Sequence, residues 1–293
     1  RLSAWLVIDC YGSTAVMQAH SVGMHVCRNE ICQALVQVMG DRIANVYYKS
    51  ETTLPYKADL HQENGFLVGG DASNVAMENG LKFHIDWLRG QKTGFFVDQR
   101  ENRSLLERYA KGRSVLNMFC YTGGFSFYAM RGGAKVVHSV DSSAKAISLT
   151  NRNVELNFPG DPRHEAYAED AFKYLEKMGS NYDLIILDPP AFAKHKNVLR
   201  NALQGYRKLN AIAFEKIKPG GILFTFSCSQ VVSKEKLPSG RIQCCRPVRA
   251  QCPHPAPTDT TRRPSGQHLP SGRGISERAG TLCRVRRGMN YEL

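Results

Sequence analysis

The sequence lacks several features that would assign it to a particular class of protein. It has no run of about 18 apolar residues, so we expect no membrane span. Its nine cysteines form no Cys-X-X-Cys pair and no His/Cys cluster at zinc-ligand spacing, which predicts reduced thiols and no metal site. The Gly-X-Gly-X-X-Gly fingerprint of dinucleotide-binding folds is also absent. The chain starts at Arg1 without a secretory signal pattern, so we expect a cytoplasmic protein.

Lysine, phenylalanine and tryptophan are missing from residues 237–293. This stretch has ten arginines and three acidic residues, so it contributes 10 − 3 = +7 of the formal net charge of +13. A basic RNA-binding tail is one interpretation of this composition. The other is translation out of frame, because a shift of one base at Leu237, with permissible codons, recovers a helix-like start, two strand-like segments and a stop. On that interpretation, residues 237–293 are predicted to be an out-of-frame, disordered tail whose charge says little about partners.

Short segments of both strand and helix type follow one another in residues 1–93. Strand patterns cover 7–12, 14–18, 45–48 and 65–68, and a helix pattern covers 30–39 and ends at Gly40. Asn79-Gly80 stands between two apolar runs, which is a strong signal for a β-hairpin. We expect a small α+β domain that packs on the following domain or guides substrate into it.

Residues 94–236 carry the pattern of a cofactor-binding α/β domain. An apolar run at 114–119 leads into Gly123-Gly124, and a strand followed by a glycine turn brings the backbone close to a ligand. The next strand ends at Asp141, where an acid can hydrogen-bond ribose hydroxyls. Asp170 suits either an adenine amino group or the N-cap of a helix. Because the dinucleotide fingerprint is missing, we predict a Rossmann-like domain that binds S-adenosylmethionine (SAM).

Two further apolar strands lead into segments with reactive side chains. The strand at 182–187 leads into Asp188-Pro189-Pro190, and the strand at 222–226 leads into Ser227-Cys228-Ser229. Ligands of open α/β sheets bind outside the carboxyl ends of the strands. Consecutive prolines fix the backbone and remove two N–H donors, so the carbonyl groups are held toward a ligand. The pattern predicts Asp188 and Cys228 at an active site.

Six motifs together resemble the bacterial class I rRNA methyltransferase family: GFFVDQRENR (94–103), LNMFCYTGGFS (116–126), SVDSSAKAI (139–147), LDPPAFAK (187–194), YRKLN (206–210) and FSCSQ (226–230). That family begins with an RNA-binding PUA domain and ends with two further strands, so we expect a chain truncated at its N-terminus. The resemblance implies a SAM site formed by Phe96, Asp98, Gln99, Arg100, Asn102, Asn117, Tyr121, Gly123, Asp141, Ser142, Asp170 and Asp188.

Well-known members of that family make 5-methylcytosine in large-subunit ribosomal RNA, so the resemblance implies ribosomal RNA as the partner. It fits a mechanism in which the Cys228 thiolate adds to C6 of cytosine and Asp188 holds N3 protonated. Base binding is then expected from Pro189, Pro190, Phe192 and Lys194, with Phe192 stacking on the base.

Other functions stay open at this point. Asp-Pro-Pro followed by an aromatic residue resembles amino-group methyltransferases, which would place the methyl group on a nitrogen of an rRNA base, guanine or an exocyclic amine. Against this, Phe192 lies one residue later than the aromatic residue of that motif. An inactive RNA-binding fragment is the non-enzymatic alternative. A homodimer is left open as well.

Overall fold

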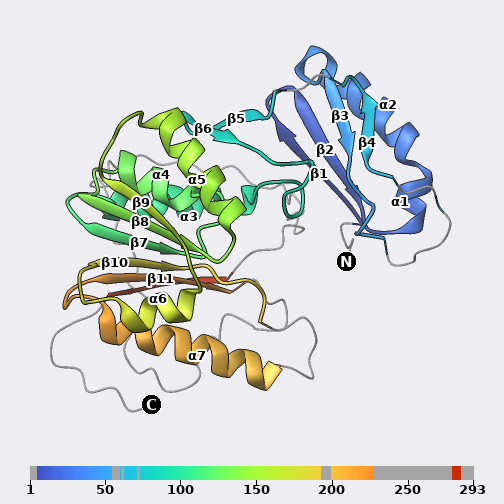
Figure 1. Cartoon of the computed structure of the whole chain (residues 1–293). Helices are drawn as coiled ribbons and strands as arrows, with labels where there is room; N and C mark the ends of the chain where they lie inside the picture. The colour runs from blue at the N-terminus through green and yellow to red at the C-terminus, as the bar shows by residue number, and fades with distance from the viewer. Residues whose placement is uncertain are drawn as a thin grey trace, which may run out of the picture.

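The computed structural model describes residues 5–54, 60, 63–70, 73–192, 199–227 and 279–284. Figure 1 shows a small N-terminal sheet, drawn in blue, beside a larger sheet with helices on both faces. None of the helices within these described ranges is long and apolar enough to cross a membrane.

The N-terminal sheet has the strand order β1-β2-β3-β4. Strands β1 (Leu6–Tyr11) and β2 (Thr14–Ala19) form an antiparallel hairpin, β3 (Asn45–Tyr48) runs parallel to β2, and β4 (Gly65–Val68) closes the sheet antiparallel to β3. Helices α1 (Val22–Val26) and α2 (Arg28–Met39) and the 3₁₀ turn η1 (Gly40–Arg42) connect β2 to β3. Apolar side chains of α2, among them Leu35, pack against Met17, Val46 and Tyr48 of the sheet. This part of the chain is the expected small α+β unit.

The predicted hairpin is present as β5 (Val75–Glu78) and β6 (Leu81–His84). Asn79 and Gly80 have φ angles of 49° and 83°, and a two-residue turn with two left-handed residues suits the twist of a hairpin. The hairpin packs mainly on the second unit, where Phe83 contacts the rings of Phe95 and Phe127, and β5 also contacts β1 of the N-terminal sheet. The hairpin thus contacts residues on both sides of the expected boundary, and the division of the chain at residue 93 stays a prediction.

The second unit is built on a six-stranded sheet of order β12-β11-β10-β7-β8-β9. Strands β7 (Ser114–Met118), β8 (Val136–Asp141), β9 (His164–Ala168), β10 (Leu184–Leu187) and β11 (Ile222–Ser227) are parallel. Helices α3 (Arg100–Ala110), α4 (Gly124–Arg131) and α5 (Ala144–Asn157) cover one face, and α6 (Ala171–Lys177) and α7 (Leu199–Lys216) cover the other (Figure 1). This arrangement confirms the predicted Rossmann-like α/β fold.

The order of the strands locates the functional edge of this sheet. The chain runs outward from β7 through β8 to β9, then returns to the other side of β7 at β10. Where the order reverses, the loops after neighbouring strands separate and leave a crevice at their carboxyl ends. Strand β10 is buried along its whole length, so the Asp188-Pro189-Pro190 segment leaves the core at that crevice.

Strand β12 (Ala279–Arg284) lies antiparallel to β11 and belongs to the stretch predicted to be a disordered tail. Regular structure at these six residues differs from that expectation, because β11 offers a free edge whose backbone groups can pair with any extended segment. The rest of 237–293 lies outside the described residues, as do Cys228 and Lys194.

Candidate active site

A cavity of about 590 Å³ lies at the carboxyl ends of β7, β8 and β10. Ten of the predicted site residues line it: Phe96, Gln99, Tyr121, Asp141, Ser142, Asp170, Asp188, Pro189, Pro190 and Phe192. Five others do not: Asp98, Arg100, Asn102, Asn117 and Gly123. The structure thus brings together residues from four of the six motifs, spread over almost a hundred positions of sequence.

The turn after β7 (residues 119–124) forms the floor of the cavity in an unusual backbone conformation. Phe119, Tyr121 and Gly123 have φ angles of 58°, 49° and 81°. A left-handed residue with a side chain costs roughly 1–2 kcal/mol, so two of them so close together need support from their surroundings. Gly123 could not be replaced, because a Cβ there would stand 2.7 Å from Phe127 and Thr150. Gly123 therefore shapes the site from behind and does not touch the cavity.

Two carboxylates anchor neighbouring loops while they face the cavity. Asp141, at the end of β8, accepts hydrogen bonds from the backbone N–H groups of Tyr121 and Ser143, each at 2.9 Å. Asp170 caps α6 by accepting a bond of 3.0 Å from the backbone N–H of Lys173. The sequence left open an N-cap or a cavity-facing role for Asp170. In the structure Asp170 caps α6 and also lines the cavity.

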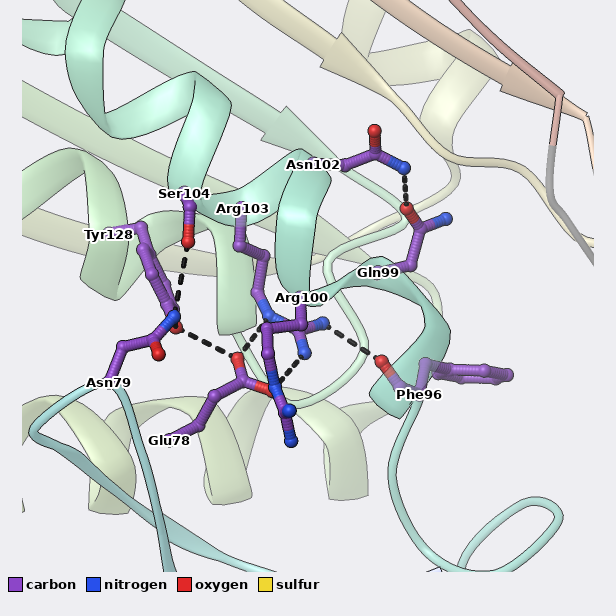
Figure 2. Close-up of polar contacts among 9 residues, drawn as sticks. All are labelled: Glu78, Asn79, Phe96, Gln99, Arg100, Asn102, Arg103, Ser104 and Tyr128. Carbon is purple, nitrogen blue, oxygen red and sulfur yellow. Dashed lines mark hydrogen bonds and ion pairs between the residues drawn. The ribbon is translucent and has the colours of Figure 1, made fainter. Parts of the chain in front are cut away.

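A third carboxylate, Asp188, is held from the FFVDQR segment. The Gln99 amide donates to Asp188 Oδ2 at 3.4 Å, and Gln99 Oε1 accepts a bond of 2.6 Å from Asn102 Nδ2. Gln99 is 1% exposed, so its amide has little freedom to turn. Asn102 thus acts on the site through Gln99, and its contact with that side chain is visible in Figure 2.

A buried ion pair joins the β5–β6 hairpin to α3 through Arg103, which also lines the cavity (Figure 2). Arg103 donates to both carboxylate oxygens of Glu78, at 2.8 and 2.7 Å, and its third nitrogen donates to the carbonyl of Phe96 at 3.0 Å. Tyr128 also donates to Glu78, at 2.9 Å. Burial opposes ionisation of this carboxyl, but the bonds and the charge of Arg103 outweigh it, so the pKa of Glu78 lies below its ordinary value. Arg100, predicted at the cofactor, instead lies 53% exposed beside Glu78.

The rim loop, residues 86–94, forms one lip of the cavity. The Tyr121 hydroxyl accepts from the Gln91 backbone N–H at 3.1 Å and donates to the Gly94 carbonyl at 3.3 Å. The Lys49 amine donates to the Gly90 carbonyl at 2.6 Å. The rim loop is therefore fastened both to the turn after β7 and to the N-terminal sheet.

Asn117 and Asp98 are also placed differently from the expectation. Asn117 is fully buried on β7 and donates to the Ser126 hydroxyl at 2.9 Å, so it ties β7 to α4. Asp98 does not line the cavity, and its negative charge is one of the causes that raise the pKa of Asp9, after burial. Asn117 therefore supports the site from outside the cavity.

The described cysteines include one that lines the cavity, Cys120. Burial, followed by the nearby charge of Asp141, raises the pKa of its thiol well above the ordinary value. A thiol that stays protonated is a poor nucleophile. Cys120 is therefore a wall residue of the site.

Several residues that shape the site were not among the predicted ones. They are Glu78, Arg89, Arg103, Lys145, Thr150 and Asn153. Arg103 lies inside a quoted motif, and its spacing of three residues from Arg100 places both on one side of α3, which was a usable signal. Its partner Glu78 lies 25 positions earlier, and no local pattern links the two.

The cavity fits SAM on its own chemistry. Its volume is ordinary for a nucleotide-sized ligand. Asp141 and Asp170 offer carboxylate acceptors of the kind that bind ribose hydroxyls and an amino group, and Phe96, Phe119 and Phe172 provide apolar walls for a flat ring.

Comparisons with known proteins agree with this fit. A ribosomal RNA large subunit methyltransferase I from Tolumonas auensis is 40% identical over 236 residues, and one from Aeromonas hydrophila is 39% identical over 235. Each alignment covers 78% of this chain and 59% of the relative, so the chain spans a little over half the length of these proteins.

Solved structures give the same picture. SMU.776, assigned as a methyltransferase and crystallised with S-adenosylhomocysteine, is 28% identical with a TM-score of 0.68, over 80% of this chain and 60% of that one. A protein from Streptococcus mutans assigned as SAM-dependent methyltransferase is 25% identical with a TM-score of 0.70, over 96% and 71%. The family model for S-adenosylmethionine-dependent methyltransferases matches residues 60–237, and this chain belongs to that family.

Proposed function

We propose that this methyltransferase acts in the cytoplasm on large-subunit ribosomal RNA and that the methyl acceptor is C5 of a cytosine. The relatives from Tolumonas and Aeromonas carry the name of a large-subunit rRNA methyltransferase, which supports the RNA as substrate. A homodimer remains a prediction that sedimentation velocity checks.

One observation supports the choice of acceptor most strongly. Strand β11 lies parallel to β10 with Leu187 opposite Thr225, and β11 ends at Ser227. The two parallel strands therefore end at the same edge of the sheet; Asp188 directly follows β10, and Cys228 is the next residue in the sequence after Ser227. We propose that the Asp188 carboxyl and the Cys228 thiol act together at this edge, because such a pair suits the activation of a pyrimidine ring.

The bound cofactor supplies an electrophilic methyl group on a sulfonium ion. On our proposal Asp141 and Asp170 hold its ribose and adenine, and Asp188, oriented by Gln99, hydrogen-bonds N3 of the base. Pro189, Pro190, Phe192 and Lys194 are proposed to bind the base, with Phe192 stacking on it.

The base is activated by a covalent bond to the enzyme. The Cys228 thiolate adds to C6, which makes C5 an enamine carbon, and C5 then accepts the methyl group. Loss of the C5 proton to a base expels the thiolate and restores the ring double bond, so the enzyme is returned unchanged.

The test is methyl transfer from labelled SAM to unmodified large-subunit rRNA, followed by digestion to nucleosides. We expect 5-methylcytidine from the parent protein and none from Cys228→Ser, with SAM binding intact in both. A methylated nitrogen, or full activity of Cys228→Ser, would move the acceptor to nitrogen. RNA binding without any transfer would show that the chain is an inactive RNA-binding fragment.

A further inference from the structure

Helix α5 has a polar stripe on a face that is otherwise packed into the protein. Thr150, Asn153 and Asn157 follow one another at spacings of three and four residues, which places them on one side of the helix. Thr150 and Asn153 are both 0% exposed. Polar groups buried this completely are retained where they hold a specific partner.

The first two residues both donate to carbonyl groups of the turn after β7, and Asn153 Oδ1 also accepts from the His84 backbone N–H of the hairpin at 2.7 Å. Thr150 Oγ1 donates to the carbonyl of Tyr121 at 2.9 Å, and Asn153 Nδ2 donates to the carbonyl of Thr122 at 3.2 Å. The Thr150 methyl group also packs closely against the turn, because a Cβ on Gly123 would stand only 2.7 Å from it. Both hydrogen bonds act on the side of the turn that faces away from the cavity.

This support falls where the backbone needs it. Tyr121 has a φ of 49°, and a left-handed residue with a side chain relaxes toward the right-handed region unless its neighbours prevent it. The backbone N–H of Tyr121 also donates to Asp141, and its hydroxyl accepts from the Gln91 N–H of the rim loop. A rotation at Tyr121 would therefore displace two walls of the SAM cavity.

We infer that Thr150 and Asn153 are positioning residues for SAM, which hold the turn after β7 in its binding conformation before the cofactor arrives. They do not line the cavity, so their effect is transmitted through Tyr121 and Thr122. When such support is removed, part of the binding free energy is spent on restoring the turn, and the apparent Kd rises by the inverse of the fraction of protein that remains competent.

Asn157 provides a matched control on the same helix. Asn157 Oδ1 accepts from the Lys82 N–H of the hairpin at 2.8 Å, and Asn157 Nδ2 donates to the Lys82 carbonyl at 2.7 Å. These two bonds do not reach the turn after β7. Replacing Asn157 removes side-chain hydrogen bonds of α5, as replacing Thr150 does, but the bonds of Asn157 to Lys82 lie at the exposed end of the helix. The two variants therefore separate a loss of stability from a loss of cofactor positioning.

The experiment compares Thr150→Val, Thr150→Ser and Asn157→Ala by SAM calorimetry and by thermal unfolding with and without SAM. Thr150→Val keeps the shape of the side chain and removes the donor. We expect its Kd for SAM to rise roughly tenfold, from the loss of one buried hydrogen bond, and the SAM-induced rise in Tm to shrink. Thr150→Ser restores the hydroxyl and should regain most of the affinity.

Asn157→Ala should lower Tm without SAM. Its Kd for SAM should stay within about twofold of the parent value, because a substitution at a distance from the site has only a small effect on binding. Unchanged SAM affinity in Thr150→Val would overturn the proposal. So would a loss of affinity in Asn157→Ala that matches its loss of stability, because the effect would then be general weakening of α5.

Discussion

At the scale of single residues, Asp141 shows how one carboxylate can both build a site and serve it. Its two oxygens accept the N–H groups of Tyr121 and Ser143, which fixes the turn after β7 relative to the start of α5. Each carboxylate oxygen has a second lone pair, and Asp141 lines the cavity, so ribose hydroxyls can still donate to it.

Replacing Asp141 by alanine should weaken SAM binding strongly. A hydrogen bond to a charged group is worth about 1.5–3 kcal/mol, which corresponds to at least a tenfold rise in Kd for each bond lost. Calorimetry on folded protein measures this directly, and Glu101→Gln, an exposed carboxylate on α3 outside the cavity, is the control. Equal affinity of Asp141→Ala and the parent would remove Asp141 from the cofactor site.

At the scale of elements, a chain of buried polar side chains crosses the sheet beside the site. His164 of β9 contacts the Ser139 hydroxyl of β8 at 2.8 Å, Ser139 contacts Ser126 of α4 at 2.6 Å, and Asn117 of β7 donates to Ser126. Burial lowers the pKa of His164 from 6.5 to about 4, with a further lowering by the neighbouring His138, while Asp161 and Glu165 oppose it. The ring is therefore neutral in the folded protein at ordinary pH.

This histidine predicts a loss of stability in mild acid. Because its folded pKa lies below its unfolded one, the unfolded chain binds the proton more readily, so the full stability is present above pH 6.5 and falls as the pH approaches about 4. At roughly 1.4 kcal/mol per unit of pKa, the difference between 6.5 and about 4 limits the loss to about 3.5 kcal/mol. Urea unfolding at pH 7 and pH 4.5 should show a smaller difference in His164→Gln than in the parent. The same difference in both proteins would contradict the assignment to His164.

At the scale of the whole molecule, the sequence predicted the parallel sheet well and the junction between the units poorly. The predicted strand at 222–226 differs from β11 by one residue, and β3 and β4 of the N-terminal sheet were placed to the residue, because apolar runs between turn residues are a local signal. The start of the helix at 28–39 was predicted two residues too late, and its end was predicted correctly. Contacts such as Tyr11 on Trp87, with ring centroids 6.2 Å apart, depend on segments far apart in sequence, and no local pattern encodes them.

The candidate site divides in the same way. Residues at strand ends, such as Asp141 and Asp188, could be predicted because topology alone brings strand ends together. Asp98, which does not line the cavity, could not, because it lies in the short 3₁₀ turn Val97–Gln99, and the side that such a turn presents depends on its tertiary partners.

The junction predicts a measurable effect on the stability of the whole chain. The Thr93 hydroxyl of the rim loop donates to Asp9 Oδ2 at 2.6 Å and lies 2.9 Å from the Tyr11 hydroxyl, and Thr93 is 1% exposed. Thr93→Val leaves two polar groups of β1 without this partner, which should cost about 1–3 kcal/mol in the free energy of unfolding. Thr93→Ser keeps the hydroxyl and should cost much less. Equal urea midpoints for the two variants would show that the hydroxyl is not what joins the units.

The contacts of Thr93 also set an order of events while the chain is being made. The partners in β1 are translated 82 and 84 residues before Thr93, and Tyr121, which holds the other side of the rim loop, follows later still. Contacts between such distant segments form late, because the entropy of closing a long loop must be overcome first. A nascent chain can thus complete its N-terminal sheet long before it has a cavity, and we expect SAM to bind only after the two units have docked.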